Sequence, residues 1–320
     1  MYDVICNGSA TVDAFIETGN KLFKGSDGHV KVPFGSKIRI EHLEFQVGGG
    51  GTNSAVALSR LGLKVAFLGK IGLGTNSKRI LNLLKKEKVD TSLIQRSNAR
   101  TGFSVILDAY KHDRIILAFK GSNDDVRFTE IKKNKLKTKW FYFSSMMNES
   151  FATQKKLAQF AAKNNIKIIY NPSAYLIKKG LKYLNPVIKH TNILTLNKEE
   201  AAMLVGKGSI KALLKKLKKL VKDIAIITDG PNGAYCYDGI HFLRLQAHNI
   251  KVKETTGAGD TFTSSFLAAL IKTHNIRTAL QLGLVNAESI ITTIGGKKNL
   301  LHWNKAMSRI KRNPAKLYEF

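Results

Sequence analysis

The chain has 320 residues, of which 43% are hydrophobic and 23% are charged, a composition that is typical of a globular protein and excludes a largely disordered one. Its 52 Lys and Arg residues outnumber 23 Asp and Glu residues, so the formal net charge is +29. No apolar stretch reaches the roughly 18 residues of a membrane span, and no basic region precedes the apolar run at the N-terminus. We therefore expect a cytoplasmic protein, and the absence of repeats and Pro-rich linkers predicts a single domain over residues 1–320.

The positive charge is compatible with a polyanion-binding protein. The lysines are nevertheless scattered along the chain, with local density only at "IKALLKKLKKLVK" (210–222). Leu213, Leu214 and Leu217 recur there at helical spacing, which predicts an amphipathic helix whose lysines face solvent. Since basic residues are not interleaved with aromatic ones, a nucleic-acid partner is disfavoured, and polyanion binding stays as an alternative function.

Six apolar runs of strand length occur along the chain, and most of them precede a helix-like segment. Strands that alternate with helices predict an α/β domain with a mostly parallel sheet and helices on both faces. The runs are "DVICNG" (3–8), "KVAFLG" (64–69), "KWFYFS" (139–144), "IKIIYN" (166–171), "NILTLN" (192–197) and "DIAIIT" (223–228).

Two segments, residues 15–47 and 100–120, interrupt this alternation. "KIRIEHLEFQV" (37–47), "GFSVILD" (102–108) and "RIILAF" (114–119) resemble extended strands with one covered face. We expect these segments to form a small β-sheet flap, or lid, contributed from two places in the chain.

The two cysteines, Cys6 and Cys236, are far apart and each lies in an apolar run of strand length. This spacing indicates neither a disulfide framework nor a zinc site. Both are expected to be buried, reduced thiols.

The first motif that suggests a ligand is "VGGGGTNSAVALSRLG" (47–62), in which four glycines precede an Ala-rich helix with Asn53 in its first turn. No Lys-Ser or Lys-Thr follows, so the motif is not a P-loop. Because consecutive glycines cost backbone entropy, we expect close approach to a ligand or a hinge. Asp13, expected at the end of the first strand, either points a carboxylate into the same cleft or is a turn residue.

"GKIGLGTNS" (69–77) nearly spells the G-x-G-x-x-G dinucleotide fingerprint through Gly72, Gly74 and Ser77. The third glycine is missing, and such a motif is weak even when complete. An NAD-dependent oxidoreductase therefore remains as a minor alternative.

"LNKEEAAML" (196–204) places Asn197 and Glu200 at the start of a predicted helix. This spacing fits a capping box. Beside a phosphate site, the same two residues could hold a hydrated Mg²⁺, which needs few protein ligands.

"TDGPNGAY" (228–235) contains Thr228, Gly230 and Gly233 in a tight turn after a strand. The turn is either a simple connection or a loop whose backbone lies against the phosphates of a nucleotide. The residues alone favour neither reading.

"ETTGAGDTF" (254–262) precedes an apolar segment that predicts a buried helix, so its glycines lie at the first helical turn. The free N–H groups of Gly257, Ala258 and Gly259 would bind an oxyanion or a phosphate there. Asp260 beside them could take a proton from a hydroxyl during phosphoryl transfer. The alternative is an acidic residue that caps the helix.

In this order, the segments resemble the PfkB-type, or ribokinase-like, carbohydrate kinases over essentially the whole chain. The C-terminal signature of that family, D-T-x-G-A-G-D, is matched by "ETTGAGD" except at its first position, and "GGGGTNSAVALSRLG" is similar to the N-terminal glycine-rich signature. The resemblance implies a ribokinase-like layered α/β/α domain with a mostly parallel central sheet and a small β-sheet lid. It also implies a kinase that uses ATP and Mg²⁺ to phosphorylate a sugar or sugar derivative.

The resemblance also assigns roles to single residues. It makes Asp260 the catalytic base and Gly257, Ala258 and Gly259 the anion hole. The other residues fall into three groups: Asp13, Gly49 and Asn53 for the acceptor, Asn197 and Glu200 for the metal, and Thr228, Gly230, Gly233 and Asn286 for the nucleotide, with Asn286 bordering its base.

Three positions depart from the family pattern. Glu254 replaces the first Asp of the signature, which leaves a monovalent-cation site open, Gly50 stands where ribokinases tend to carry Lys, and "KIGLGTNSKRI" (70–80) lacks an acidic G-x-D pattern. The acceptor could therefore be a free sugar, a sugar phosphate or a nucleoside, and ADP could replace ATP as the donor. Related lids often make a dimer contact, so the resemblance allows a homodimer through the lid and leaves the oligomeric state open.

Overall fold

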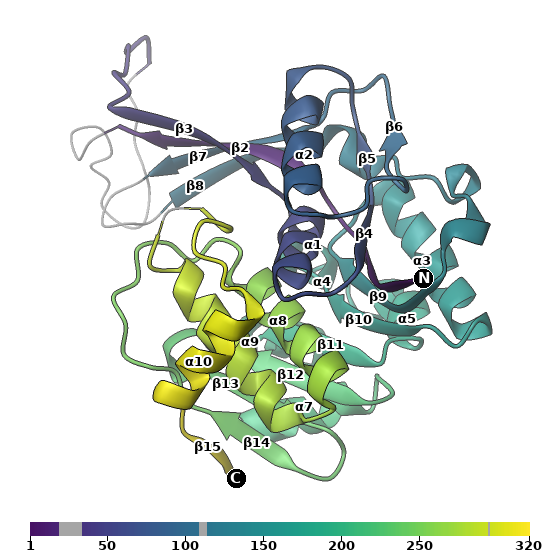
Figure 1. Ribbon diagram of the computed structural model, residues 1–320, viewed down its shortest axis with the longest axis vertical. Coiled ribbons are helices and arrows are strands. Elements are labelled where there is room, and N and C mark those ends of the chain that lie inside the picture. Colours follow the sequence, from purple (N-terminus) through teal and green to yellow (C-terminus); the bar gives the residue numbers. More distant parts are fainter. Residues whose placement is uncertain (19–33, 109–113, 294) are drawn as a thin grey trace.

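The computed structural model describes residues 1–18, 34–108, 114–293 and 295–320. Its centre is a sheet of nine strands among these residues, in the order β15-β14-β13-β12-β11-β10-β9-β1-β4 (Figure 1). The six apolar runs expected as strands form the parallel part of this sheet, as the sequence predicts. They are β1 (Tyr2–Asn7), β4 (Val65–Leu68), β9 (Thr138–Ser144), β10 (Lys167–Asn171), β11 (Ile193–Asn197) and β12 (Ile224–Thr228).

Three further strands extend the sheet beyond β12 with antiparallel pairing: β13 (Ala234–Tyr237), β14 (Phe242–Leu245) and β15 (Leu317–Glu319). A separate pair, β5 (Lys70–Ile71) and β6 (Gln95–Arg96), makes a two-stranded sheet. The central sheet is thus parallel except at one edge, where a hairpin reverses its direction.

Helices cover both faces of the central sheet. Alternate residues of β1 point to opposite faces, so Val4 and Cys6 enter one apolar cluster and Ile5 enters the other. The first cluster includes buried residues of α1, α2, α8, α9 and α10, and the second includes those of α3 to α7. The helices are α1 (Gly50–Arg60), α2 (Thr75–Lys86), α3 (Asn148–Lys163), α4 (Ala174–Ile177), α5 (Leu181–Ile188), α6 (Lys198–Val205), α7 (Ile210–Lys218), α8 (Ala258–Thr273), α9 (Ile276–Ile290) and α10 (Trp303–Arg312). Short 3-10 turns cover Gly121–Asp124, Phe128–Glu130, Lys133–Lys135 and Gly230–Asn232.

A second sheet projects from this layered α/β/α body (Figure 1). It has the order β3-β2-β7-β8, and its two parts come from the segments expected to form a lid. Its strands are β2 (Thr11–Glu17), β3 (His42–Gly48), β7 (Gly102–Asp108) and β8 (Arg114–Phe119). Residues 19–33 and 109–113 of the expected lid lie outside the described residues.

The placement of Asp13 corrects one expectation. The sequence places this residue at the end of the first central strand, but that strand ends at Asn7 and Asp13 lies inside the lid strand β2. The break is fixed by Ala10, whose N–H donates to Asn123 Oδ1 at 2.8 Å while Asn123 Nδ2 donates back to the Ala10 carbonyl at 2.9 Å. The lid therefore begins four residues before the expected Phe15, and Asp13 belongs to its root.

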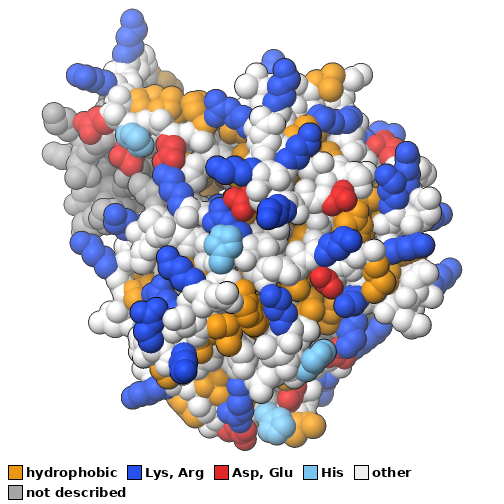
Figure 2. Space-filling view, viewed as in Figure 1, with side chains coloured by type: hydrophobic (Ala, Val, Ile, Leu, Met, Phe, Trp, Pro, Cys, Tyr) orange, Lys and Arg blue, Asp and Glu red, His pale blue; other side chains and the backbone are white. Residues whose placement is uncertain are grey.

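The basic helix expected from "IKALLKKLKKLVK" is α7, in which Leu213, Leu214 and Leu217 are buried. Figure 2 shows Lys and Arg side chains spread over the whole visible face instead of gathered in one patch. Cys6 and Cys236 are buried and unpaired. Among the described residues, no helix is both long and apolar enough to cross a membrane.

Candidate active site

A cleft of about 490 Å³ lies where four central strands end, which is the usual ligand-binding edge of an α/β sheet. The last residues of β9, β10, β11 and β12 form its floor, and the beginnings of α1 and α8 close one side. Its lining consists of Ser9, Gly50, Lys120, Ser144, Ser145, Asn171, Pro172, Ser173, Tyr175, Thr195, Asn197, Glu200, Thr228, Gly257, Gly259 and Asp260.

The start of α8 presents backbone N–H groups to this cleft. Gly257 is the N-cap with φ 79° and ψ 1°, a left-handed conformation that favours glycine. Ala258 donates its N–H to the Thr255 carbonyl at 3.1 Å, whereas the N–H groups of Gly257, Gly259 and Asp260 have no acceptor in the described chain. A Cβ atom added at Gly259 would meet nothing within 4 Å. This helix start therefore leaves an open cradle of N–H groups of the kind that can bind an anion, and the Ala258 N–H is not among the unpaired donors.

Asp260 sits in the third position of α8 beside this cradle. Asn53 of α1 donates from Nδ2 to Asp260 Oδ2 at 2.9 Å. Burial raises the pKa of Asp260, and the Asn53 hydrogen bond and the Lys297 ammonium oppose that rise. The carboxyl group is thus held in a fixed orientation, with one cation to favour its ionised form.

Asp13 is buried, and Thr11 Oγ1 donates to its Oδ1 at 2.8 Å. Burial raises the pKa of Asp13, while the Thr11 hydrogen bond and Lys297 lower it. The neighbouring strand leaves room only for glycine, because a Cβ atom at Gly48 would lie 1.7 Å from Asp13 Oδ2. The next residue, Gly49, has φ 94° and caps α1.

The glycine-rich segment thus brings Asp13, Asn53 and Asp260 to one region, although they lie in β2, α1 and α8. Its glycines allow close packing of the chain against itself: a Cβ atom at Gly49 would lie 2.5 Å from the Ser9 carbonyl oxygen. The close approach expected from the sequence is therefore present, and the contacts that it makes are with the protein's own backbone and side chains.

Asn197 and Glu200 form the capping box at the start of α6. Asn197 Oδ1 accepts from the Glu200 N–H at 2.8 Å, and Glu200 Oε2 accepts from the Asn197 N–H at 3.0 Å. Both residues also line the cleft, and burial raises the pKa of Glu200. The capping role and a role in metal binding are compatible, because each side-chain oxygen keeps a lone pair.

Thr228 ends β12 and lines the cleft. The two glycines that follow it serve the turn into β13: Gly230 has φ 51°, and Gly233 has φ 92° and lies so close to the Leu245 carbonyl oxygen that a Cβ atom would be 1.9 Å from it. Of these three residues, Thr228 alone is in the lining of the cleft.

Asn286 is fully buried in α9. Its Nδ2 donates to Ser265 Oγ at 2.8 Å, and its Oδ1 accepts from the Leu301 N–H at 2.9 Å. The structure thus uses this amide to join α9, α8 and the segment before α10, and does not bring it to the cleft.

The stretch that resembles a dinucleotide fingerprint follows the central strand β4 and precedes α2. It does not turn directly from strand to helix, because β5 comes between them and pairs with β6 in the separate two-stranded sheet. A Cβ atom at Gly72 would lie 2.1 Å from the Ala99 carbonyl oxygen. This glycine is therefore needed for packing against the protein's own chain. The structure thus gives no support to the alternative that the protein binds NAD at this stretch.

Several residues of the site are not indicated by the sequence. Lys297, from the segment between α9 and α10, is buried and donates to Asn53 Oδ1 and, at 2.6 Å, to the Val47 carbonyl. Lys120 and Tyr175 reach the cleft from after β8 and from α4, with the Lys120 ammonium 5.2 Å from the Tyr175 ring centroid. One lysine among 52 basic residues carries no pattern that would mark it.

Comparison with known proteins identifies the family. The family model described as pfkB family carbohydrate kinase matches residues 5–303. The chain belongs to the pfkB family of carbohydrate kinases. This pfkB-family kinase is 26% identical over 287 residues to a ribokinase of Haemophilus influenzae, a match that covers 86% of this chain and 92% of the relative.

Solved structures support the fold of this pfkB-family kinase. A nucleoside kinase of Methanocaldococcus jannaschii, an archaeal member of the ribokinase family, has a TM-score of 0.81 at 22% identity and covers 98% of this chain and 99% of its own. The ribokinase of Arabidopsis thaliana, solved with ribose and ATP, has a TM-score of 0.83 at 19% identity, with 97% and 99% covered. The fold is ribokinase-like, and the protein is a phosphotransferase that acts on a hydroxyl group.

Proposed function

We propose that this protein transfers the γ-phosphoryl group of ATP to a hydroxyl of a sugar or a sugar-containing molecule, with Asp260 as the base. The observation that carries the proposal is the position of the Asp260 carboxyl group beside the open N–H cradle of α8, to which Asp260 also contributes its own N–H group. A carboxylate beside an anion site opposes anion binding, but it fits the removal of a proton from an attacking hydroxyl.

In this mechanism, each group of residues in the cleft has a separate role. Asp260 takes the proton of the acceptor hydroxyl as its oxygen attacks the γ-phosphorus. The N–H groups of Gly257, Gly259 and Asp260 donate hydrogen bonds to the oxygens of the phosphoryl group during its transfer, and the dipole of α8 stabilises the negative charge on those oxygens. Asp13, Gly49 and Asn53 hold other hydroxyls of the acceptor, and the lid lies over it to exclude water.

The donor side of the cleft includes Asn197, Glu200 and Thr228. Their oxygens fit Mg²⁺, which takes oxygen ligands, keeps several waters and is usually held with the phosphates of its nucleotide. The described residues contain no cluster of three or more His, Cys, Asp or Glu side chains that would form a metal cage, so the phosphates would complete the coordination. Bound there, Mg²⁺ would neutralise charge that develops on the phosphates. Because ATP is the donor, we also propose a cytoplasmic location.

A sugar is our first choice of acceptor, with a nucleoside as the second. Both names occur among the similar proteins: the Haemophilus influenzae relative is a ribokinase and the Methanocaldococcus jannaschii structure is a nucleoside kinase. Residues that bind hydroxyls suit either molecule, since both carry a pentose or hexose ring.

The test is ATP consumption with Mg²⁺ over a panel of pentoses, hexoses, sugar phosphates and nucleosides, with ADP as a second donor. Asp260→Asn is expected to lower kcat by about 10²- to 10⁴-fold and to leave the KM for ATP close to that of the wild type. Asp223→Asn is the matched control, because Asp223 lies just before β12, at the opposite end of the strand from the cleft. Wild-type turnover by Asp260→Asn would show that Asp260 is not the base.

We also propose that two copies associate through the outer face of the lid sheet. The strand register puts Phe45, Val105 and Leu117 on the face opposite to Asp13 and Ser104. Part of this outer face is apolar and open, since Phe45, Leu117 and Phe119 are 45%, 58% and 52% exposed, whereas Val12 and Ala14 on the same face are buried. A contiguous apolar face of this kind marks an interaction surface.

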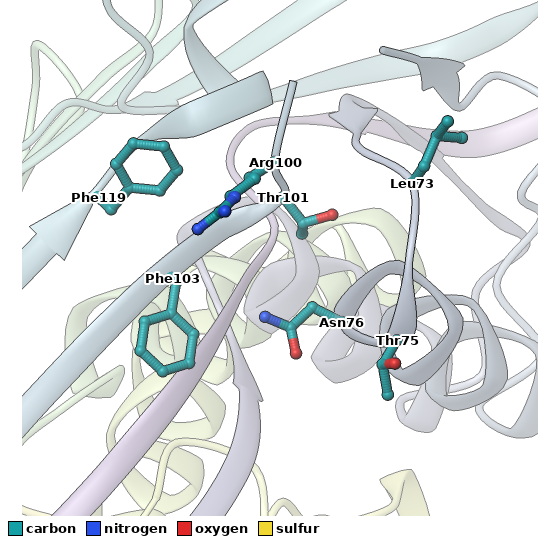
Figure 3. A pocket seen from close by; sticks show the side chains of 7 residues that line it. All are labelled: Leu73, Thr75, Asn76, Arg100, Thr101, Phe103 and Phe119. Atoms are coloured by element: carbon teal, nitrogen blue, oxygen red, sulfur yellow. The ribbon is translucent and has the colours of Figure 1, made fainter. Parts of the chain in front are cut away.

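A cavity of about 600 Å³ borders the same face. Figure 3 shows Phe103 and Phe119 of the lid strands on one side of it, and Thr75 and Asn76 at the start of α2 on the other. Side chains from a second lid would fill this cavity and cover the exposed rings.

Light scattering after size-exclusion chromatography tests the dimer. Leu117→Glu on the outer face is expected to yield monomers. Ile116→Glu is the control, because Ile116 is in the same strand, is 45% exposed and points to the opposite face. A wild-type monomer, or a dimer that persists in Leu117→Glu, would contradict this interface.

A further inference from the structure

The ammonium group of Lys297 joins three parts of the molecule. The segment between α9 and α10, yellow in Figure 1, rises to the base of the lid. From there Lys297 Nζ donates to the Val47 carbonyl of β3 at 2.6 Å and to Asn53 Oδ1 of α1. The side chain is only 8% exposed, which is unusual for lysine and requires compensating contacts.

Contact with Lys297 decides how the Asn53 amide is oriented. An ammonium can only donate, so it must face the oxygen of the amide. The nitrogen of that amide then points the other way, where it donates to Asp260 Oδ2 at 2.9 Å. If the amide turned over, its oxygen would face the carboxylate of Asp260 and the hydrogen bond would be lost.

Charge gives Lys297 a second effect on the same carboxylate. Lys297 lies near both Asp13 and Asp260 and opposes the rise in pKa that burial causes in each. Burial lowers the pKa of Lys297 itself to about 8, against the attraction of these two carboxylates. The other charged groups that act on Lys297 are Arg60 and Glu87.

The other titratable groups that interact with this pair of carboxylates are Glu200 and the buried phenol of Tyr142, which act on Asp260, and Glu254, which acts on Asp13. None of them is a cation. Lys297 is therefore the cation that the described residues place next to the pair formed by Asp13 and Asp260.

The backbone around Lys297 is fixed from both sides, so the ammonium is held in place. The Gly295 N–H donates to Glu254 Oε2 at 2.7 Å. Arg60 Nη1 donates to the Lys297 carbonyl at 2.9 Å, and Arg60 is paired with Glu87 at 2.6 Å. These bonds connect the segment to the irregular stretch before α8 on one side and to α1 on the other.

We propose that Lys297 is a positioning residue for phosphoryl transfer: it fixes the Asn53 amide against Asp260, places a cation beside that carboxylate and ties lid strand β3 to the same point. The proposal rests on the proposed function, in which Asp260 is the base. It adds a cation that acts on the base through Asn53 and through charge, without contact to the nucleotide.

Three variants separate these effects. Lys297→Met removes both the charge and the donor, and Lys297→Gln removes the charge but keeps an N–H donor for Asn53. Lys298→Met is the matched control. Lys298 is the next residue and also binds β3, through Glu44 Oε1 at 2.7 Å, but its side chain is about half exposed, unlike the buried side chain of Lys297.

The readouts are kcat, the KM for ATP, and the pH dependence of kcat/KM. Without Lys297, the pKa of Asp260 rises, so less of it is ionised at a given pH and the acid limb moves to higher pH. We expect Lys297→Met to lose at least tenfold in kcat at pH 7 with this shift, while the KM for ATP changes little. Lys297→Gln should keep the shifted limb but recover part of kcat, and Lys298→Met should match the wild type.

Wild-type kcat and an unmoved acid limb in Lys297→Met would overturn the proposal. Equal effects of Lys297→Met and Lys298→Met would do so as well, because they would show that the loss comes from the lid contact alone.

A second measurement does not depend on activity. In Lys297→Met, Asp13 and Asp260 lose the cation that opposes the rise in pKa caused by their burial, so the pKa of each rises further. The folded protein then binds more protons than the unfolded chain, and stability falls as pH rises. The difference between the Tm of Lys297→Met and that of the wild type should therefore shift progressively against the variant between pH 4 and pH 7. If the Tm difference between the two proteins did not change with pH, the placement of the ammonium would be wrong. If the Tm difference changed with pH as expected but no acceptor in the panel were phosphorylated, only the proposed function would be wrong.

Discussion

Gly259→Ala should have two opposite effects: it should stabilise the folded protein and lower its kinase activity. The added methyl group meets no atom within 4 Å, and Gly259 lies in the helical conformation of α8, where alanine is accepted without strain. Replacing glycine at such a position stabilises by about 0.4–1 kcal/mol, chiefly by restricting the unfolded chain. The same methyl group would project into the cleft in front of the N–H cradle, where the phosphoryl oxygens are expected.

Loss of one well-placed N–H contact of this kind costs about 10²–10³ in kcat. We therefore expect Gly259→Ala to show a Tm raised by about 1–3 °C and a kcat lowered by at least 10²-fold. Differential scanning calorimetry and single-turnover kinetics at saturating ATP measure the two effects. Wild-type kcat in the more stable variant would refute the position assigned to the cradle.

Gly257→Ala is the matched comparison in the same turn. Gly257 has φ 79°, a left-handed conformation that costs a residue with a Cβ atom about 1–2 kcal/mol. Its Cβ atom would also lie 3.2 Å from Gly296 Cα. This variant should lose stability as well as activity, so only the pair of variants distinguishes a blocked cradle from a damaged helix start.

Two further predictions concern carboxylates. Glu200→Gln should raise the Mg²⁺ concentration needed for half-maximal activity, measured by titration at fixed ATP; an unchanged titration would leave Glu200 with its capping role alone. The Arg60 hydrogen bond lowers the pKa of Glu87, so its stabilisation is complete above the unfolded pKa near 4.5 and is lost as pH falls through the lower folded value. Urea unfolding should therefore show Glu87→Gln to be less stable than the wild type at pH 7 but close to it at pH 3, and equal differences at both pH values would exclude the ion pair as the cause.

The sequence predicts the parallel part of the central sheet well, because each strand is an unbroken apolar run. Such runs are typical of strands that are buried on both faces. The edge strands β14 and β15 carry no such signal: Leu317–Glu319 has three residues and pairs only because α10 returns the chain to β14. This strand forms because of its tertiary contact with β14, and its own residues carry no strand pattern.

The candidate active site shows the same division between local pattern and tertiary contact. The turn chemistry of "ETTGAGD" predicts the cradle because glycines and a following carboxylate have a local physical reason to be there. Lys297 has none, since its partner Asn53 is 244 residues away and its burial depends on how three distant segments meet. Asn286 is the reverse case: the family resemblance suggests a nucleotide contact, but the fold uses both ends of its amide internally.

The four consecutive glycines, Gly48 to Gly51, differ in how much space the structure leaves for a side chain. At Gly48, Gly49 and Gly51 a Cβ atom would lie within 2.6 Å of another atom, in two cases a backbone atom, so substitution there should abolish folding before it alters specificity. At Gly50 the nearest atoms are Ser144 Oγ at 3.0 Å and Asp260 Oδ1 at 3.2 Å, and both belong to side chains that border the cleft. A saturation library at Gly50 alone is therefore the most economical route to variants that choose a different acceptor, because it changes the wall next to Asp260 and spares the scaffold.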